Sequence, residues 1–187
     1  MQILATLAAV SILLAPQAAK EPPAKIPETI FVAEKPADAK CVAEVKRAAK
    51  KGDTVVVQAK IGGRAEPFVK NRAVFLVADR CIRSCDEIPG DTCTKPWDYC
   101  CEPAESKKAN MMTVQFVGAD GKPLKVGAQG TKGLEPLALI VVEGKVAEAD
   151  DKGTFIVNAT KVHIEKPAKD ARVKDDAAPN AKGTAAK

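Results

Sequence analysis

The sequence predicts a mainly β domain: a small barrel of five strands that follows one short helix and carries a cysteine-rich loop between its second and third strands. Three observations support this fold class. Short apolar or alternating segments recur between turn-forming residues from residue 52 onward. Gly144 stands inside one such segment, and the alternation of the last segment slips at Ala159 and Thr160, which predicts a bend and a β-bulge. Five of the six cysteines fall in the one long stretch that has neither pattern.

One amphipathic helix is expected between residues 38 and 51. Its apolar positions recur with the spacing of one helix face, namely Cys41, Val42, Val45, Ala48 and Ala49. Asp38 can cap the first turn and Gly52 can end the helix. Cys41 is then expected to face the core or the cysteine-rich loop.

The strands are expected at residues 54–61, 73–78, 111–117, 137–146 and 154–164. The third strand turns at Asp120-Gly121 into a short return segment, 123–126, as in a hairpin. A bend at Gly144 and a late bulge are what a small closed barrel needs to turn its corners, so an OB-like barrel is the expected architecture. A β-sandwich of the same strands is the alternative.

The ends of the chain differ in composition from this domain, which is assigned to residues 37–165. The apolar run from Ile3 to Leu14 is too short to span a bilayer and has the length of a signal-peptide core, so residues 1–19 are interpreted as a signal peptide. Residues 20–36 are rich in proline and are interpreted as a linker. Residues 166–187 form an Ala- and Lys-rich tail without large apolar residues, predicted to be disordered. An exported protein, periplasmic or extracellular and without a transmembrane helix in its mature form, is expected.

The cysteines are the most distinctive chemistry in the chain. In an oxidising compartment they are candidates for structural disulfides, all six taking part: Cys41, Cys81, Cys85, Cys93, Cys100 and Cys101. Six cysteines allow 15 complete pairings, and the sequence selects none of them. The neighbours Cys100 and Cys101 are expected to reach different partners, because successive side chains of an extended segment point to opposite sides. Cys41 would tie the helix to the insertion at residues 79–109.

Metal binding is the alternative use of the same thiols. Cys81, Cys85, Cys93, Cys100 and Cys101 could converge as thiolates on zinc, copper or an iron–sulfur cluster. The spacing lacks the usual two-residue knuckle and the insertion contains no histidine, so no metal or other cofactor is favoured. Thiol redox exchange is a third reading, weakened by the lack of a Cys-x-x-Cys pair.

Four residues of the insertion are candidates for ligand binding. Trp97 and Tyr99 alternate with Asp98 and could present aromatic faces, although covering a disulfide is the commoner role of such residues. Arg80 and Arg83 could line a neighbouring groove or form a solvated rim. Phe75 and Phe116 lie among aliphatic residues, which favours their burial over stacking on nucleic-acid bases.

Nothing in the sequence supports catalysis. The single histidine, His163, has no nucleophile or carboxylate motif near it, and Gly62-Gly63 is not followed by the lysine and hydroxyl of a phosphate-binding loop. The net charge of +5 arises from 29 basic and 24 acidic residues without a long run of one sign, which is typical of a mixed solvated surface. A protein that is not an enzyme is expected.

Two segments carry a resemblance to known proteins. Residues 142–146 with 153–160 resemble the closing hairpin of bacterial OB-fold domains, and residues 52–165 resemble a family of small, exported, uncharacterised bacterial proteins with the signature Pro-Trp-Asp-Tyr-Cys-Cys, here residues 96–101. The resemblance implies an OB-like fold and export but no activity. The expected function is therefore an exported, monomeric or weakly associating interaction module of the cell envelope that binds an unknown protein or envelope ligand through a disulfide-stabilised loop. An OB-fold nucleic-acid or oligosaccharide binder is a further alternative, with nucleic acid disfavoured.

Overall fold

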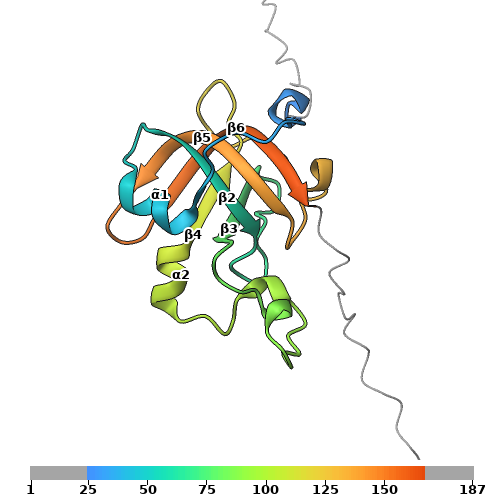
Figure 1. The fold of residues 1–187 in the computed structure, drawn as a ribbon. Coiled ribbons are helices and arrows are strands. Elements are labelled where there is room, and N and C mark those ends of the chain that lie inside the picture. Colours follow the sequence, from blue (N-terminus) through green and yellow to red (C-terminus); the bar gives the residue numbers. More distant parts are fainter. Residues whose placement is uncertain (1–24, 167–187) are drawn as a thin grey trace, which may run out of the picture.

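The computed structural model describes residues 25–166 (Figure 1). Its strands are β1 (Lys40–Cys41), β2 (Thr54–Ile61), β3 (Val74–Asp79), β4 (Met111–Gln115), β5 (Leu139–Ala149) and β6 (Phe155–Lys166). Its α-helices are α1 (Val42–Ala48) and α2 (Ala104–Asn110), and its 3-10 helices are η1 (Glu28–Ile30), η2 (Cys85–Glu87), η3 (Pro96–Asp98) and η4 (Thr131–Gly133). Within the described residues, no helix has the length and apolar character needed to cross a bilayer.

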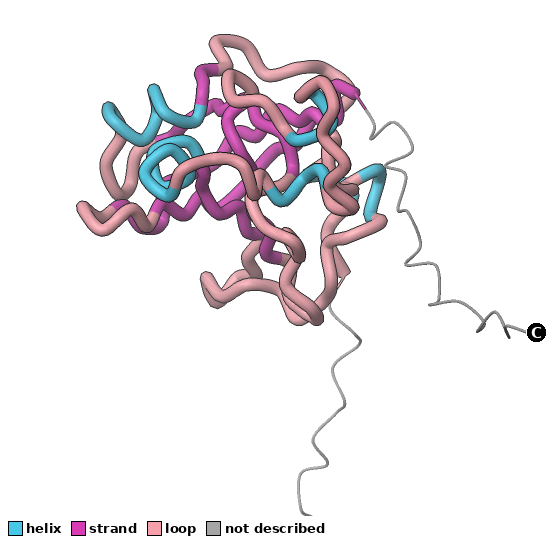
Figure 2. Tube along the Cα trace, turned by 90° about the horizontal axis from the view of Figure 1, so that it is seen from below, coloured by secondary structure: helices cyan, strands magenta, loops and turns pink. Residues whose placement is uncertain are grey.

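The five longer strands close into a barrel. Around it, β2 pairs with β3, β3 with β4, β4 with β6 and β6 with β5, and β5 returns to β2. The β4–β6 pair is parallel and the other four pairs are antiparallel. This strand order confirms the predicted mainly β fold with an OB-like barrel. Figure 2 shows the strands in the middle of the molecule, with helices and loops around them.

Two backbone features turn the corners of the barrel. Glu143 pairs with Lys161 whereas Gly144 pairs with Ala159, so Thr160 is the extra residue of a bulge, as predicted. A Cβ on Gly144 would clash with the carbonyl oxygen of Asn158. Glycine is therefore required where β5 bends closely over β6.

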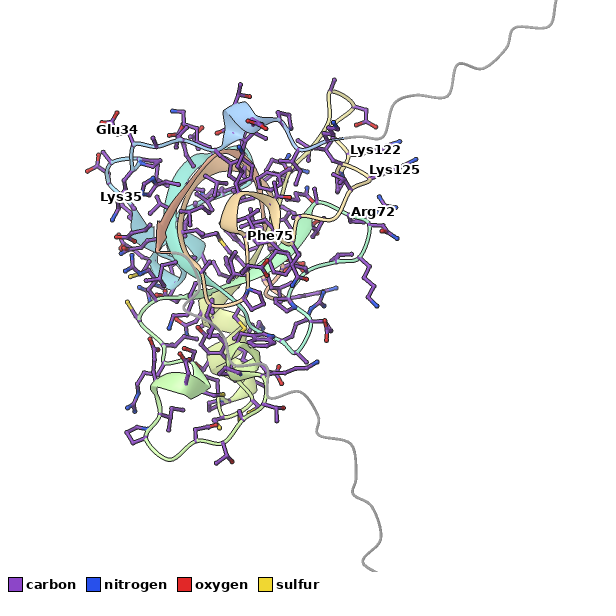
Figure 3. The ribbon with its side chains drawn as sticks, turned by 90° about the vertical axis from the view of Figure 1, so that its right-hand side faces the viewer. Glu34, Lys35, Arg72, Phe75, Lys122 and Lys125 are labelled. Atoms are coloured by element: carbon purple, nitrogen blue, oxygen red, sulfur yellow. The ribbon has the colours of Figure 1, made fainter. Side chains whose placement is uncertain are left out.

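The core fills the barrel with branched and aromatic side chains. Phe75 and Phe116 are fully buried, with ring centroids 5.8 Å apart, and Figure 3 places Phe75 inside the molecule. Their burial agrees with the expectation from their aliphatic neighbours and removes them as stacking surfaces. The predicted return segment after β4 forms one antiparallel bridge, between Val117 and Pro123, flanked by hydrogen bonds from the Gly118 N–H to the Lys122 carbonyl and from the Leu124 N–H to the Phe116 carbonyl.

The segment 25–36 corrects the predicted linker, because its described residues pack against the barrel. Ile26 is buried in the core, and the ring of Phe31 lies 6.0 Å from that of Phe116. The backbone N–H of Val32 donates to the carbonyl of Val162 at 2.9 Å. Three apolar side chains among the prolines were sufficient to anchor this segment: Ile26, Ile30 and Phe31. The predicted signal peptide and the tail from residue 167 lie outside the described residues.

Helix α1 is shorter than predicted and is capped differently. Asp38 has a φ of 57° and lies outside the helix, which begins at Val42 after Cys41. The first turn is satisfied instead by Asp79 at the end of β3, whose Oδ2 accepts the Ala43 N–H at 2.9 Å. A residue distant in sequence has taken the capping role.

Candidate functional site

The cysteine insertion, residues 80–110 between β3 and β4, lies against one end of the barrel (Figure 1). Its attachment point is Gly62-Gly63, just after β2. The Gly63 N–H donates to the Trp97 carbonyl at 2.8 Å, and the Trp97 Nε1–H donates to the Ala65 carbonyl at 3.1 Å. A Cβ on Gly62 would stand 2.6 Å from the Trp97 carbonyl oxygen, so the paired glycines form a cradle for the insertion.

Trp97 and Tyr99 pack inside the insertion, which corrects their prediction as ligand-binding residues. Trp97 is 7% exposed and Tyr99 is 1% exposed. Tyr99 has a φ of 54° and packs with Ala78 and Met111 on the outer face of β3 and β4. Its hydroxyl is buried without a hydrogen-bond partner among the described residues. Neither aromatic ring offers a face to a ligand.

A buried lysine on β2 holds the start of the insertion. The Lys60 Nζ donates to Ser84 Oγ at 2.9 Å and lies 2.7 Å from Glu87 Oε1. Glu87 and Ser84 also close a capping box around η2, with the Ser84 N–H donating to Glu87 Oε2 at 3.0 Å. Partial burial raises the pKa of Glu87, but its hydrogen bonds with Lys60 and Ser84 outweigh that effect and leave the pKa below its usual value.

The six cysteines carry free thiols, so the predicted disulfides are not formed in the structure. Four of them nevertheless converge, because the Sγ atoms of Cys85, Cys93, Cys100 and Cys101 all lie within 4.8 Å of one another. Cys100 is central, with its Sγ 3.1 Å from that of Cys93, 3.8 Å from that of Cys85 and 3.9 Å from that of Cys101. These four residues are the thiolate ligands that a metal could use.

The two remaining cysteines form a separate pair. The Sγ atoms of Cys41 and Cys81 are 3.0 Å apart, which places the start of α1 beside the start of the insertion. Cys81 is therefore separated from the other insertion cysteines with which it was grouped as a metal ligand. Asp79 completes this second cluster, since its carboxylate accepts the N–H groups of both Ala43 and Cys81.

The thiols differ in how readily they ionise. Hydrogen bonding with Cys41, and then with Asp79, raises the pKa of Cys81 to about 12. The Cys100 thiol raises the pKa of Cys101 to about 11, and Asp91 raises the pKa of Cys93. Hydrogen bonds from Cys93 and then Cys85 lower the pKa of Cys100. Cys100 is consequently the thiol of its cluster that is favoured to become the thiolate, the reactive form.

The two arginines predicted as binding residues differ in their contacts. Arg80 is partly buried and engaged, since its Nη1 donates to Gln58 and to Glu165. Arg83 is exposed. Arg80 therefore ties the end of β3 to β6 and is not free to receive a ligand, whereas Arg83 remains a surface residue.

A groove beside the insertion combines an apolar floor with a basic rim. Its volume is about 440 Å³. Residues of β3, β4 and the start of β6 form the floor, namely Leu76, Met111, Met112, Thr113 and Phe155. The rim residues come from the β2–β3 loop, α2 and the β5–β6 turn, namely Arg64, Lys107, Lys108, Lys152, Gly153 and Thr154. Among the described residues, no acidic side chain lines this groove.

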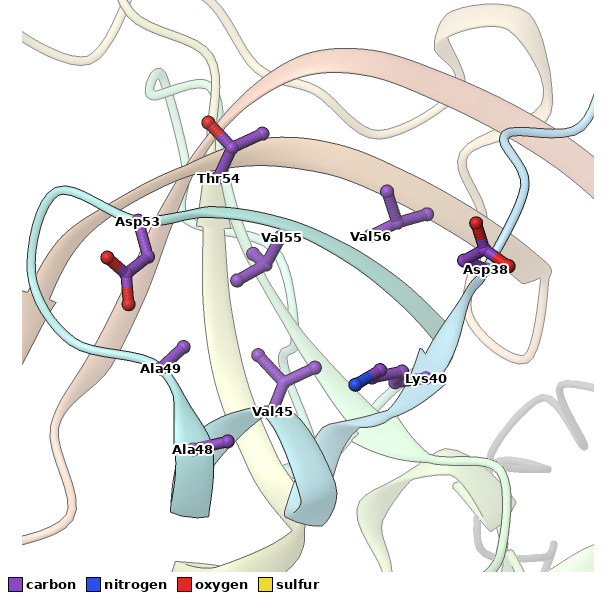
Figure 4. A pocket seen from close by; sticks show the side chains of 9 residues that line it. All are labelled: Asp38, Lys40, Val45, Ala48, Ala49, Asp53, Thr54, Val55 and Val56. Atoms are coloured by element: carbon purple, nitrogen blue, oxygen red, sulfur yellow. The ribbon is translucent and has the colours of Figure 1, made fainter.

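A second hollow, of about 510 Å³, lies between α1 and the start of β2 (Figure 4). Its walls are small apolar side chains, including Val45, Ala48 and Val55, and both acidic and basic residues stand at its edge: Asp38, Lys40 and Asp53. Because its edge carries charges of both signs, this hollow favours neither an anionic nor a cationic ligand.

His163 is half-buried on β6, and its Nδ1 lies 3.2 Å from the Val32 carbonyl oxygen. That contact gives it a structural role in holding the N-terminal segment.

The basic groove was missed at the sequence level because its cations come from three separate segments. No protein-family model and no curated protein matches the chain.

Proposed function

We propose that the protein is an exported, non-enzymatic binding module of the cell envelope, and that its ligand site is the basic groove beside the cysteine insertion. The observation that carries this proposal is a rim of four cations, Arg64, Lys107, Lys108 and Lys152, above an apolar floor. Because Trp97 and Tyr99 are buried, we propose this groove as the binding surface in place of the two aromatic rings. The charged rim and apolar floor support a binding role for this groove.

The rim charges are available for an anionic ligand. None of the four forms an ion pair with a carboxylate within residues 25–166. Lys107 donates only to the Asp98 carbonyl at 3.4 Å, and the Arg64 Nε–H donates to the Glu66 carbonyl at 2.8 Å. Unpaired cations around one hollow raise the local concentration of anions.

The floor indicates which polyanion is favoured. Binding of single-stranded nucleic acid relies on exposed aromatic rings that stack on bases. Phe155 is the aromatic residue of the groove and is only 4% exposed. We therefore propose an acidic polysaccharide, whose sulfate or carboxylate groups would meet the rim while its sugar rings cover Leu76 and Thr113.

Fluorescence anisotropy with fluorescein-labelled dextran sulfate tests this proposal. The double variant Lys108→Ala/Lys152→Ala should weaken binding about fivefold, since each exposed charge contact contributes roughly 0.2–1 kcal/mol. Lys122→Ala/Lys125→Ala is the matched control, because these two exposed lysines lie at the opposite end of the molecule from the insertion (Figure 3). The control should bind like the unsubstituted chain.

The same titration separates the alternatives. Binding should weaken as salt rises past about 0.1 M, where charges are screened beyond about 10 Å, and neutral dextran should not compete. Equal loss in both double variants would show non-specific attraction and reject the groove. Tighter binding of an oligothymidylate than of dextran sulfate would assign the groove to nucleic acid instead.

Metal binding is a second candidate function, favoured by the convergence of four Sγ atoms within 4.8 Å. A tetrahedral zinc site with Zn–S bonds of about 2.3 Å has sulfur–sulfur edges of about 3.8 Å. Two of the three contacts of Cys100, at 3.8 and 3.9 Å, fit this geometry, while the 3.1 Å contact with Cys93 is too short for it. Measuring zinc, copper and iron in the purified chain tests this candidate.

A further inference from the structure

We propose that the oxidised chain contains three disulfides, Cys41–Cys81, Cys93–Cys100 and Cys85–Cys101. This assignment does not depend on the function of the groove. It reduces the 15 pairings that the sequence allows to one, and it follows from which sulfur atoms the folded backbone brings into contact.

The first bridge joins the start of α1 to the end of β3. The Sγ atoms of Cys41 and Cys81 are 3.0 Å apart, closer than the 3.5–4.0 Å or so at which non-bonded heavy atoms rest. The Asp79 carboxylate holds both segments, since it accepts the Ala43 N–H at 2.9 Å and the Cys81 N–H at 2.8 Å. Closing the gap to an S–S bond of about 2.05 Å therefore requires only a small side-chain adjustment.

The second bridge lies within the insertion. Cys100 is 3.1 Å from Cys93 but 3.8 Å from Cys85, measured between Sγ atoms. A bond between the neighbours Cys100 and Cys101 is disfavoured, because adjacent Cα atoms are about 3.8 Å apart, below the usual 4.4–6.8 Å of disulfides, and because their Sγ atoms lie 3.9 Å apart. Cys93 is therefore the partner of Cys100.

The third bridge uses the two cysteines that remain. The Sγ atoms of Cys85 and Cys101 lie within 4.8 Å of each other, in the same cluster. Their bond would link the buried Cys85, at the start of η2, to the exposed end of the segment that carries Trp97 and Tyr99. Cys100 and Cys101 then reach different partners.

The oxidant is a disulfide exchange partner, either a small-molecule or a protein disulfide. In the insertion, the Cys100 thiolate attacks one sulfur of that disulfide, forms a mixed disulfide and releases one thiol. The Cys93 sulfur, after losing its proton to solvent, then attacks Cys100 and releases the second thiol. Each bridge thus removes two hydrogens from the chain and reduces one partner disulfide to two thiols.

The test is a disulfide map of the full chain, oxidised with glutathione disulfide and alkylated in mild acid with N-ethylmaleimide before digestion. Trypsin should yield residues 41–46 cross-linked to residues 81–83, and one separate peptide, 84–107, with two internal bridges. No thiol should be alkylated. A cross-link between residues 41–46 and the peptide 84–107 would overturn the first bridge.

Single substitutions decide the pairing inside the insertion. Cys93→Ser should leave the alkyl label on Cys100, and Cys85→Ser should leave it on Cys101, as located by fragment ions between the two residues. The reverse pattern would establish Cys85–Cys100 with Cys93–Cys101 and refute the assignment.

A measurement on the unsubstituted chain tests the same pairing and does not depend on whether the variants fold. Cleavage at Asp and Glu separates residue 85 from residue 93, and both from residues 100–101. Stepwise partial reduction then opens one disulfide at a time, and alkylation labels the two cysteines that it had joined. A native mass that includes zinc, with all four insertion thiols alkylated after unfolding without a reductant, would replace the two insertion disulfides with a metal site.

Discussion

The ammonium group of Lys60 lies 2.7 Å from Glu87 Oε1, and this contact joins the wall of the barrel to the cysteine insertion. The side chain of Lys60 is 7% exposed whereas that of Glu87 is 45% exposed, so the lysine depends on this carboxylate more than the carboxylate depends on the lysine. Removing the acid would leave a buried cation with only the Ser84 hydroxyl as a partner.

Glu87→Gln is therefore expected to destabilise the fold. Breaking a buried pair costs about 3–5 kcal/mol, and solvent access at Glu87 reduces the expected loss to about 2 kcal/mol. Urea unfolding measures the change. Glu28→Gln is the matched control, since it removes the exposed Lys132–Glu28 pair, and it should change the free energy of unfolding by less than about 0.5 kcal/mol. Equal effects of the two substitutions would contradict the role of the Lys60 contact.

The same contact predicts a dependence on pH. Partial burial opposes ionisation of Glu87, but Lys60 and Ser84 hold its folded pKa below the usual value. A depressed folded pKa stabilises the fold above the unfolded pKa of about 4.3, and that contribution is lost as pH falls through the folded pKa. The difference in unfolding free energy between the unsubstituted chain and Glu87→Gln should be largest near neutral pH and shrink below about pH 4. A difference that grows on acidification would refute this.

Gly62→Ala is expected to displace the insertion from the barrel. The new Cβ would lie 2.6 Å from the Trp97 carbonyl oxygen and 3.0 Å from the Tyr99 ring, which costs about 1–3 kcal/mol by overpacking. Gly127→Ala provides the control, because its Cβ would meet no atom within 4 Å and its φ is not positive. Trp97 fluorescence during denaturant unfolding reports both changes. An unaltered Gly62→Ala midpoint would show that the insertion docks elsewhere.

Tyr99→Phe is expected to leave stability unchanged or raise it, by up to about 1 kcal/mol, because it removes a buried hydroxyl that has no hydrogen-bond partner among the described residues. Tyr99→Ala should instead cost about 3–5 kcal/mol through lost packing against Ala78 and Met111. Thermal unfolding of the two variants separates the contribution of the aromatic ring to stability from that of its hydroxyl. A marked loss in Tyr99→Phe would show that the hydroxyl is bonded.

Thr113→Trp is expected to fill the groove. Thr113 is half-buried on the groove floor, between Leu76 of β3 and Ile156 of β6. An indole at this position should reduce dextran sulfate affinity at least about tenfold, a loss of about 1.4 kcal/mol or more, while the circular dichroism spectrum stays unchanged. Gln115→Trp, two residues further along the same strand and outside the groove lining, is the control. Full binding by Thr113→Trp would place the ligand elsewhere.

Local patterns in the sequence determined the barrel. The segment 54–61 coincides with β2, and the slip at Ala159–Thr160 became the bulge between β5 and β6, because strand pairing follows from alternation and turns that neighbouring residues encode. The cap of α1 could not be predicted in this way. Asp79 replaces Asp38 in that role from more than thirty residues away in sequence, and only the folded chain brings it there.

The candidate sites depend almost entirely on such distant contacts. The sequence by itself determined that cysteines gather in one insertion and that no catalytic motif accompanies them. Only the tertiary structure decided that Cys41 meets Cys81, that Trp97 rests in the Gly62-Gly63 cradle and that basic residues of three segments surround one groove. The physical reason is that each of these arrangements is fixed by packing between segments, and packing at long sequence separation leaves no periodic signal along the chain.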